Sequence, residues 1–336
     1  MKYDLQNQRG QMRGILPPYI LEAIAENAPA RIAAEAKETL KRDTYFRAVR
    51  EHETIALNQA EAESQSKAAD ATEATATATV TATPERIIYD MEHKKGTQYL
   101  PGKVVLRAEG QSACGDEAAD EAYDGLGYTL EFYRQIFQRN SIDGEGMALV
   151  ASVHYNESYN NAFWEGRQMV FGDGDGKYFQ CFTRSLDVIG HELTHGVVQF
   201  TAGLNYSAQP GALNESICDV MGSLIKQWRL NQTVNQADWL IGAELFTAEV
   251  PGAALRSMKQ PGTAFNHPVL EKDRQVGHMD DFIYTEEDNR GVHLNSGIPN
   301  RAFYLAATAI GGYAWEKAGQ IWYQTVCDRK LKNNFG

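Results

Sequence analysis

The hydrophobic and polar positions follow different periods in the two halves of the chain. Between residues 86 and 184, short runs such as GKVVLRAEG and ALVASVHYNE are rich in β-branched and aromatic residues, which predicts strands. One helical pattern, EAADEAYDGLGYTLEFYRQIF, interrupts these runs. From Leu186 onward, apolar residues recur every three or four positions, which predicts helices. A β-rich lobe followed by a helical lobe indicates an α+β fold rather than alternating βαβ units.

Residues 1–52 have the pattern of a small helical module that precedes the two lobes. Pro17 and Pro18 come directly before the stretch ILEAIAENAPARIAAEAKETLKRDTYFRAVRE, whose apolar positions have helical spacing. Proline cannot donate the backbone hydrogen bond of a helix interior but is tolerated in a first turn. The break at Pro29 therefore predicts two helices.

Residues 53–84 form a segment of different composition, rich in Ala, Thr, Glu and Ser with almost no bulky apolar side chains. Such a segment buries too little surface to offset the entropy lost on ordering, so we predict a flexible linker. The rest of the chain divides into a β-rich lobe over residues 85–185 and a helical lobe over residues 186–336.

Charge and composition exclude several classes of partner. The chain has 44 acidic and 32 basic residues and a net charge of -12, the wrong sign for broad contact with phosphate backbones, so we expect no nucleic acid partner. It has no apolar run of about 18 residues and no segment resembling a signal peptide, so we expect no membrane insertion. The expected location is the cytoplasm as synthesised, with secretion by a non-standard route left open. The cysteines are too far apart for a zinc ribbon or a disulfide framework: Cys114, Cys181, Cys218 and Cys327.

The sequence HELTH places two histidines on one face of a predicted helix. His191 and His195 are four residues apart, so their side chains project in the same direction about 6 Å apart along the axis and can bind one metal ion. Glu192 is rotated by about 100°, close to the metal but not bound to it, where it can accept a proton from water. Because such a motif arises by chance in roughly 1% of chains of this size, a third ligand is needed.

Glu215 supplies that third ligand, 20 residues after His195 in the segment LNESICD. Asp219 lies one turn further on the same helix face and can hold the second ring nitrogen of one histidine, and Asn214 can hold that of the other. Two neutral histidines and a carboxylate leave one tetrahedral position open for water, as in catalytic zinc sites. The predicted cofactor is a single Zn²⁺ ion.

The motifs together resemble the thermolysin family of neutral metalloendopeptidases. HELTH and NESICD are preceded by YNNAFWEGRQMVFGDGDG and followed by LRSM and DNRGVHLNSGIPN, in the family's order. The resemblance covers residues 86–336 and implies a two-lobed α+β protease with the zinc-binding helix between the lobes. The module containing PPYIL resembles the protealysin-like branch. This implies that residues 1–52 are an inhibitory propeptide and that the linker contains the processing site.

The resemblance also implies roles for residues around the metal. Glu192 is the general base, and Tyr206 and His293 stabilise the oxyanion of the tetrahedral intermediate; a phenol and an imidazole are suitable donors where negative charge develops. Asp288 orients His293 and favours its protonated form. Arg290 stands where the family usually has glycine, and we expect it to lie close enough to His293 to alter its pKa.

Substrate recognition is likewise implied by the resemblance. Asn161 and the backbone of Ala162 bind the main chain of a polypeptide substrate as an added strand, and Arg256 donates to a substrate carbonyl. An apolar pocket implies cleavage on the amino side of bulky hydrophobic residues. The positions that match this pocket are Phe179, Phe182, Val188, Ile241, Leu245 and Leu255, which could equally be plain core.

The chain departs from the family at the paired calcium ions near the zinc helix. Asp187 and Asp238 remain, but other aligned positions carry Lys226, Leu240 and Ala243. A site that has lost carboxylates and gained an ammonium is a poor calcium site. We therefore expect no paired structural calcium, and Lys226 to act as a fixed cation beside Asp187.

Two other interpretations remain open. A zinc aminopeptidase could use the same ligands, but it needs an acidic group for the substrate amino terminus, and no Gly-x-Met-Glu-Asn segment precedes the motif. The chain ends at KLKNNFG where the family usually continues, which suggests a zinc-bound but inactive binding protein; the presence of Glu192 argues against it. The main expectation is a monomeric endopeptidase acting on polypeptides.

Overall fold

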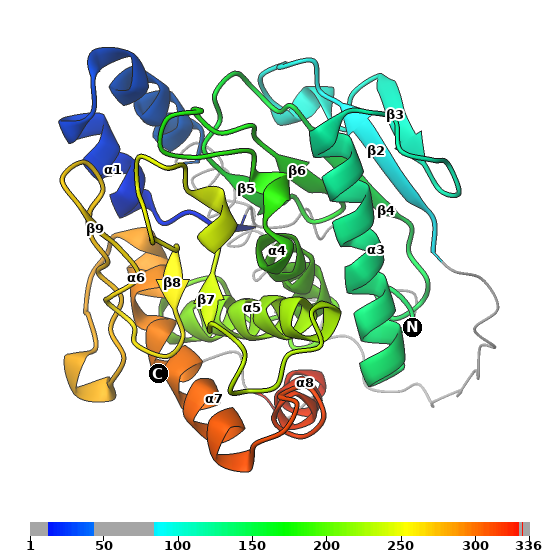
Figure 1. Cartoon of the computed structure of the whole chain (residues 1–336), viewed down its shortest axis with the longest axis vertical. Coiled ribbons are helices and arrows are strands. Elements are labelled where there is room, and N and C mark those ends of the chain that lie inside the picture. The colour runs from blue at the N-terminus through cyan, green and yellow to red at the C-terminus, as the bar shows by residue number, and fades with distance from the viewer. Residues whose placement is uncertain (1–12, 44–83, 329–330, 332–336) are drawn as a thin grey trace, which may run out of the picture.

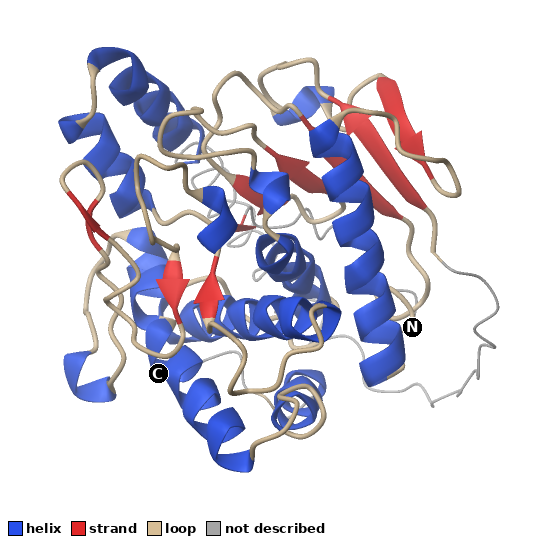
Figure 2. Ribbon diagram, viewed as in Figure 1, coloured by secondary structure: helices blue, strands red, loops and turns tan. Residues whose placement is uncertain are grey.

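The computed structural model describes residues 13–43, 84–328 and 331. The linker predicted over residues 53–84 lies outside the described residues except at Pro84. The described part forms a β-rich lobe and a helical lobe, with helix α4 between them (Figure 1). The strands of the larger sheet gather in one lobe, as the change in periodicity predicted, whereas the other lobe is mainly helical with a few short strands (Figure 2).

The β-rich lobe is built on a six-stranded sheet with the order β1-β5-β6-β4-β2-β3. Strand β4 pairs in parallel with both β2 and β6, and the other neighbours are antiparallel. The edge strand β1 comes from the N-terminal module and pairs with β5, with Gly14 opposite Phe163. The strands are β1 (Arg13–Gly14), β2 (Arg86–Asp90), β3 (Val104–Ala108), β4 (Leu149–Val153), β5 (Ala162–Trp164) and β6 (Met169–Phe171).

Helix α3 (Glu117–Phe137) packs against this sheet through a face of buried alanine, leucine and aromatic side chains. Asp116 caps its first turn by accepting a hydrogen bond from the backbone of Ala119, which satisfies one of the free amide groups there. At the other end, Gln138 adopts a left-handed backbone and terminates the helix.

Among the described helices, α4 and α5 have the most extensive mutual contact. Gly190 on α4 faces Gly222 on α5. A Cβ atom added at Gly222 would lie 2.3 Å from the backbone oxygen of Asp187. Larger residues at these positions would push the two helices apart, and the predicted metal ligands lie on both of them. The helices are α4 (Leu186–Gln199), α5 (Ala208–Arg229), α6 (Asp288–Asn295), α7 (Gly297–Ile310) and α8 (Ala318–Cys327).

Short elements connect the helices of this lobe. Two antiparallel pairs join β7 with β8 and β9 with β10. Among the described residues, no helix combines the length and the apolar character needed to cross a membrane. The four cysteines are all free. The short elements are β7 (Leu240–Ile241), β8 (Arg256–Ser257), β9 (Asn266–His267), β10 (Glu271–Lys272) and the 3-10 helices η1 (Thr97–Tyr99), η2 (Phe182–Arg184), η3 (Ala243–Leu245) and η4 (Met279–Asp281).

The N-terminal module consists of α1 (Pro18–Asn27) and a second helix over residues 30–43. The break at Pro29 confirms the prediction of two helices. Pro18 occupies the first turn of α1, where its missing amide hydrogen is not needed. Ile20 and Ile24 on α1 are fully buried and belong to the same hydrophobic core as both lobes.

Candidate metal centre and active site

Helices α4 and α5 bring the three predicted metal ligands together in the interior. His191, His195 and Glu215 are all fully buried. The Nε2 atoms of the two histidines lie 3.4 and 3.3 Å from the two carboxylate oxygens of Glu215. His191 Nε2 and Glu215 Oε2 form no hydrogen bond with any other described residue. Buried polar atoms are normally satisfied, so this convergence fits a cation that the three side chains would share.

The second nitrogen of each histidine is held by a neighbour on α5. Nδ1 of His191 lies 2.8 Å from Oδ1 of Asp219, and Nδ1 of His195 lies 2.9 Å from Oδ1 of Asn214. Both contacts are those that the helical spacing predicted. They direct the Nε2 atoms of both rings toward Glu215, as outer partners do in metal sites.

Cys218 is a further neighbour of the centre, which the sequence analysis named only among the four dispersed cysteines. Its Sγ lies 3.1 Å from Nδ1 of His195. His191, His195 and Cys218 each have one atom that could bind a metal, and these three atoms lie within 4.8 Å of one another. We favour Glu215 as the third ligand because Asn214 already contacts that Nδ1, whereas Glu215 meets the Nε2 atoms of both rings. The position of Cys218 one turn after Asn214 was the available signal.

The charges around the centre determine the protonation of its carboxylates. Burial raises the pKa of Glu215, but the charges of His293 and His195 outweigh it and hold that pKa well below its usual value. Burial opposes ionisation of Asp219 as well, yet Arg256 and His191 lower its pKa to about 2. Both carboxylates are therefore ionised, which a metal site requires of its acidic ligands and of their supporting groups.

Glu192 lies beside the metal ligands and contacts the edge of the sheet. Its Oε2 accepts a hydrogen bond of 3.0 Å from the backbone nitrogen of Trp164 on β5. Burial raises its pKa well above the usual value, and the nearby charge of Glu215 adds to this effect. A carboxylate with a raised pKa, next to a site for metal and water, is suited to accept a proton.

Tyr206, His293 and Asp288 form the opposite wall of the centre. The hydroxyl of Tyr206 donates to Glu215 and lies 3.4 Å from Nε2 of His293. Asp288 accepts from Nδ1 of His293 at 2.6 Å and from its backbone nitrogen at 2.8 Å. Burial opposes protonation of His293, but the charges of Asp288 and Glu215 outweigh it and raise the pKa of the ring. For Tyr206, burial and then the charge of Glu215 both raise the pKa of the hydroxyl. Both groups are thus kept as hydrogen-bond donors.

Arg290 departs from the expectation that it acts on His293. Its guanidinium pairs with Glu286 at 3.2 Å on the surface, and both side chains are largely exposed. The charges that raise the pKa of His293 are instead those of Asp288 and Glu215. The backbone of Arg290 is left-handed, with φ at 65°, a conformation that glycine adopts without strain. The turn, rather than the chemistry of His293, explains a preference for glycine at this position.

Residues 14–16 of the N-terminal module lie in contact with the predicted substrate-binding groups. Ile15 donates its backbone N–H to the carbonyl of Ala162 at 3.2 Å, and its own carbonyl accepts from Nη1 of Arg256 at 2.8 Å. The backbone N–H of Leu16 donates to Oδ1 of Asn161 at 3.1 Å. The carbonyl of Gly14 lies 3.1 Å from Nε2 of His293. The groups predicted to bind a substrate main chain thus bind this segment.

The second helix of the module reaches the same groups from another side. Asp43 is buried and accepts from Nδ2 of Asn161 at 2.9 Å and from the hydroxyl of Tyr159 at 2.7 Å. Asn161 is therefore held by the module at both ends of its amide. No local pattern pointed to Asp43, because it is 118 residues from Asn161 along the chain.

The six predicted pocket residues are brought together in the hydrophobic core. All are fully buried, and the rings of Phe179 and Phe182 lie 5.8 Å apart. Ile15 belongs to the same buried cluster. Their assignment to a substrate pocket stays a prediction, which concerns Phe179, Phe182, Val188, Ile241, Leu245 and Leu255.

Lys226 lies among three carboxylates near the start of α4. Its Nζ is 3.1 Å from Asp187 and from Asp238 and 3.2 Å from Glu244. Asp187 is fully buried, so the ammonium compensates a charge that water does not reach. The pairing with Asp187 was expected, whereas Glu244 was not identified from the sequence. The absence of calcium stays a prediction.

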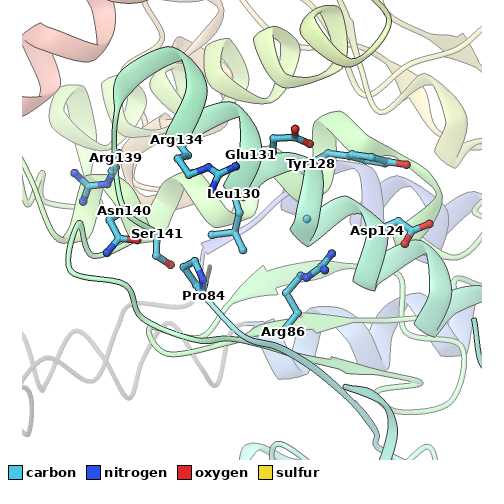
Figure 3. A pocket seen from close by; sticks show the side chains of 11 residues that line it. Pro84, Arg86, Asp124, Tyr128, Leu130, Glu131, Arg134, Arg139, Asn140 and Ser141 are labelled. Atoms are coloured by element: carbon cyan, nitrogen blue, oxygen red, sulfur yellow. The ribbon is translucent and has the colours of Figure 1, made fainter. Parts of the chain in front are cut away.

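A separate hollow of about 230 Å³ lies beside α3 (Figure 3). Its lining includes Arg86, Tyr128 and Arg134 and none of the residues predicted for the active site. Arg86 already forms an ion pair with Glu109 at 2.6 Å. We therefore do not assign the hollow to the active site.

A buried His-Glu-x-x-His helix, joined by a carboxylate from the following helix, defines a metallopeptidase. Two family descriptions match the chain: the catalytic domain of thermolysin metallopeptidases over residues 47–199, and their alpha-helical domain over residues 202–335. The chain belongs to the thermolysin family of metallopeptidases. It is therefore a metalloendopeptidase, a hydrolase of peptide bonds, and both the predicted fold class and the enzyme class are confirmed.

Individual relatives agree with this family. The chain is 50% identical over 325 residues to an extracellular metalloprotease of Pectobacterium carotovorum subsp. carotovorum, covering 95% of this chain and 86% of the relative. It is 48% identical over 200 residues to an extracellular minor metalloprotease of Serratia marcescens, covering 60% and 57%. The solved precursor of protealysin from Serratia proteamaculans matches with a TM-score of 0.82 and 48% identity over 96% of this chain and 89% of that chain.

These relatives bear on two of the expectations from the sequence. The likeness to a precursor supports the interpretation of the chain as a zymogen with a propeptide. The expected cytoplasmic location is wrong, because the relatives from Pectobacterium and Serratia marcescens are named extracellular. Absence of a recognisable signal segment was a weak basis for that expectation, since it tests only one export route.

Proposed function

We propose that the chain is the precursor of a zinc-dependent endopeptidase that cleaves polypeptides before bulky hydrophobic residues and acts as a monomer. The observation that carries the proposal is the convergence of His191, His195 and Glu215 next to Glu192. Buried titratable groups that gather in one place with shifted pKa values are typical of catalytic sites.

Zinc is the metal that suits this donor set. Two imidazole nitrogens and one carboxylate oxygen are the protein ligands of many catalytic zinc sites, and Asp219 and Asn214 support the rings from behind. A zinc ion bound there supplies Lewis acidity toward a water molecule and toward the carbonyl of the bond to be cut.

The remaining side chains divide the work of hydrolysis. Glu192 takes a proton from the attacking water, which its raised pKa favours, and can pass that proton to the leaving nitrogen. Tyr206 and His293 donate hydrogen bonds to the oxygen on which negative charge develops. Asp288 keeps the ring of His293 in the orientation and protonation state for this role.

The groups that hold residues 14–16 position a substrate main chain, and the apolar pocket residues select its side chain. Asn161, Ala162 and Arg256 bind main-chain atoms and are indifferent to the side chain. Selection then falls to the six apolar pocket residues, whose surroundings reject charged side chains because burying a charge is costly. A bulky hydrophobic residue after the cleaved bond is the substrate that this lining favours.

The N-terminal module acts as an intramolecular inhibitor in this proposal. Its residues use the hydrogen-bonding groups of the cleft, and α1 and Asp43 fix them in place. Polypeptide substrates and the module therefore compete for the same groups. Proteolysis within residues 53–84 separates the module, residues 1–52, from the two lobes at 85–185 and 186–336.

The test combines metal analysis with two kinds of peptide. Processed protein should contain one zinc ion per chain and hydrolyse an end-blocked peptide with a central leucine or phenylalanine. Hydrolysis restricted to peptides with a free amine would instead assign an aminopeptidase. Stoichiometric zinc with no hydrolysis of either peptide would leave only a binding function.

A further inference from the structure

Residues 14–16 occupy the groups predicted to bind a substrate main chain, as an added antiparallel strand rather than as a mere cover over the cleft. Strand β1 runs antiparallel to β5, and its hydrogen bonds continue through Ile15 and Leu16 to Ala162 and Asn161. The carbonyl of Gly14, the N–H and carbonyl of Ile15 and the N–H of Leu16 each have a partner. An inhibitor bound in the reverse direction would not place consecutive N–H and carbonyl groups on these partners in this order.

The carbonyl of Gly14 is placed where the reacting carbonyl would be. It lies 3.1 Å from Nε2 of His293, the donor assigned to the developing oxyanion. Helix α4 packs against both β1 and β5, and Glu192 is anchored on the backbone of Trp164, the residue opposite Arg13. Within the described part of the chain, Oε1 of Glu192 is buried and forms no hydrogen bond. The general base is therefore anchored on β5, the strand that pairs with β1, with one oxygen uncommitted.

The two residues on either side of this bond also suit cleavage. Ile15 is fully buried and is the kind of bulky apolar residue that the proposed specificity requires after the cut. At Gly14, an added Cβ would lie 2.7 Å from Nδ2 of Asn161, so the backbone approaches the binding groups as closely as glycine permits. The main chain at Gly14 is therefore in close contact with Asn161.

We propose that the Gly14–Ile15 peptide bond is itself a cleavage site, cut within the same molecule by its own active site. This inference rests on the proposed function. Water adds to the carbonyl carbon of Gly14, Glu192 accepts one of its protons, and the bond to the nitrogen of Ile15 breaks as that nitrogen gains a proton. The products are a carboxylate on Gly14 and an amino terminus on Ile15, with no other reactant needed.

This cut differs from processing in the linker because it leaves the inhibitory module in place. The carbonyl of Ile15 remains bound to Arg256, the N–H of Leu16 to Asn161, and Asp43 to Tyr159. The buried side chains of α1 stay in the common core. The clipped precursor therefore stays inhibited until the chain is also cut within residues 53–84.

Intact-mass spectrometry of zinc-loaded precursor tests the proposal. We expect a species that begins at Ile15 to accumulate at a rate independent of protein concentration over a hundredfold dilution, and no such species from Glu192→Gln. A rate proportional to concentration would assign the cut to a second molecule and overturn the proposal. If the Gly14–Ile15 bond stays intact while the processed protein hydrolyses end-blocked peptides, the proposal is overturned and the proposed function is unaffected. If neither this bond nor the end-blocked peptide is hydrolysed, the proposed function itself is overturned.

A second measurement checks the substrate-like register without relying on catalysis. In zinc-free precursor, the amides of Ile15 and Leu16 should be protected from hydrogen exchange, and Ile15→Asp should lower that protection at least tenfold. Ile15→Leu, which keeps a bulky apolar side chain, should preserve it. Equal protection in Ile15→Asp would show that the segment is not held as a substrate, and would overturn the proposal.

Discussion

Asp219 and Arg256 share two hydrogen bonds of 2.7 Å, from Nε and Nη2 of the arginine to the two carboxylate oxygens. The same carboxylate accepts from Nδ1 of His191, and the same guanidinium donates to the carbonyl of Ile15. All of these side chains are almost completely buried. One ion pair therefore links the orientation of His191, a proposed metal ligand, to the binding of residues 14–16 in the cleft.

Replacing Asp219 should weaken metal binding although it is not a ligand. In Asp219→Asn, the ring of His191 loses its charged partner and Arg256 becomes an uncompensated buried charge. We expect zinc affinity to fall by about 10- to 100-fold, measured by competition with a chelator. Asp280→Asn, which makes the same change on an exposed side chain, should leave affinity unaltered. Equal affinities in both variants would contradict the supporting role.

Glu192→Gln should abolish hydrolysis while zinc remains bound. The amide keeps an oxygen that can accept from Trp164, but it cannot take a proton from water. We expect less than about 1% of the parent activity, a loss of roughly 3 kcal/mol of transition-state stabilisation or more. Peptide hydrolysis and metal analysis on the same sample decide the matter. Loss of the metal would instead make Glu192 part of the binding site.

Lys226 should replace calcium as the source of positive charge near α4. We expect millimolar calcium to raise the melting temperature of the parent by no more than about 1 °C, since an ion present at about a hundredfold excess over its dissociation constant would stabilise the protein by about 2.7 kcal/mol and raise it by about 4 °C. A larger rise, with calcium bound at Asp187 and Asp238, would refute this.

The same cluster predicts the effect of removing the lysine. In Lys226→Ala, the buried carboxylate of Asp187 loses its cation, and the free energy of unfolding should fall by about 3–5 kcal/mol. The control Lys177→Ala removes a partly exposed ion pair with Glu249 and should cost less than about 1 kcal/mol. Urea unfolding measures both, and similar losses would argue against a special role for Lys226.

His154 should make stability depend on pH. Its hydrogen bond to Asp173 raises its pKa to about 9, with burial opposing and Asp116 contributing further. Because this pKa exceeds the usual histidine value, the ion pairs stabilise fully below about pH 6.5 and are lost as the pH rises through about 9. The difference in urea midpoint between the parent and His154→Gln should therefore shrink from pH 6 to pH 9.5. The matched change His278→Gln, on an exposed histidine, should show no such trend.

Removal of the N-terminal module should activate the enzyme. We expect cleavage between residues 52 and 84, before Ile55, Leu57 or Val80, to give a catalytic part that begins near Glu85 and hydrolyses peptides faster than the precursor. The reason is that Asn161, Ala162 and Arg256 then become available to substrates. Mass spectrometry of the product and its peptidase rate are measured together. Unchanged activity after removal of residues 1–52 would favour an accessory domain over an inhibitor.

The sequence by itself determined those features whose geometry is local. Helical spacing alone predicted that His191 and His195 share a face, that Glu192 lies beside it, and that Asp219 lies one turn beyond Glu215. The order of strand-like and helical patterns likewise predicted the α+β division. Residues a few positions apart on a helix have nearly fixed separations, so sequence spacing translates directly into distance.

Only the tertiary structure decided which distant segments meet. Gly14 and His293 are 279 residues apart in the chain, and Asp43 and Asn161 are 118 apart, yet both pairs are in contact. Glu244 joins Lys226 for the same reason. Apolar patterns show that an element has a face to bury but not which partner buries it, because burial is non-directional and depends on how all the elements pack together.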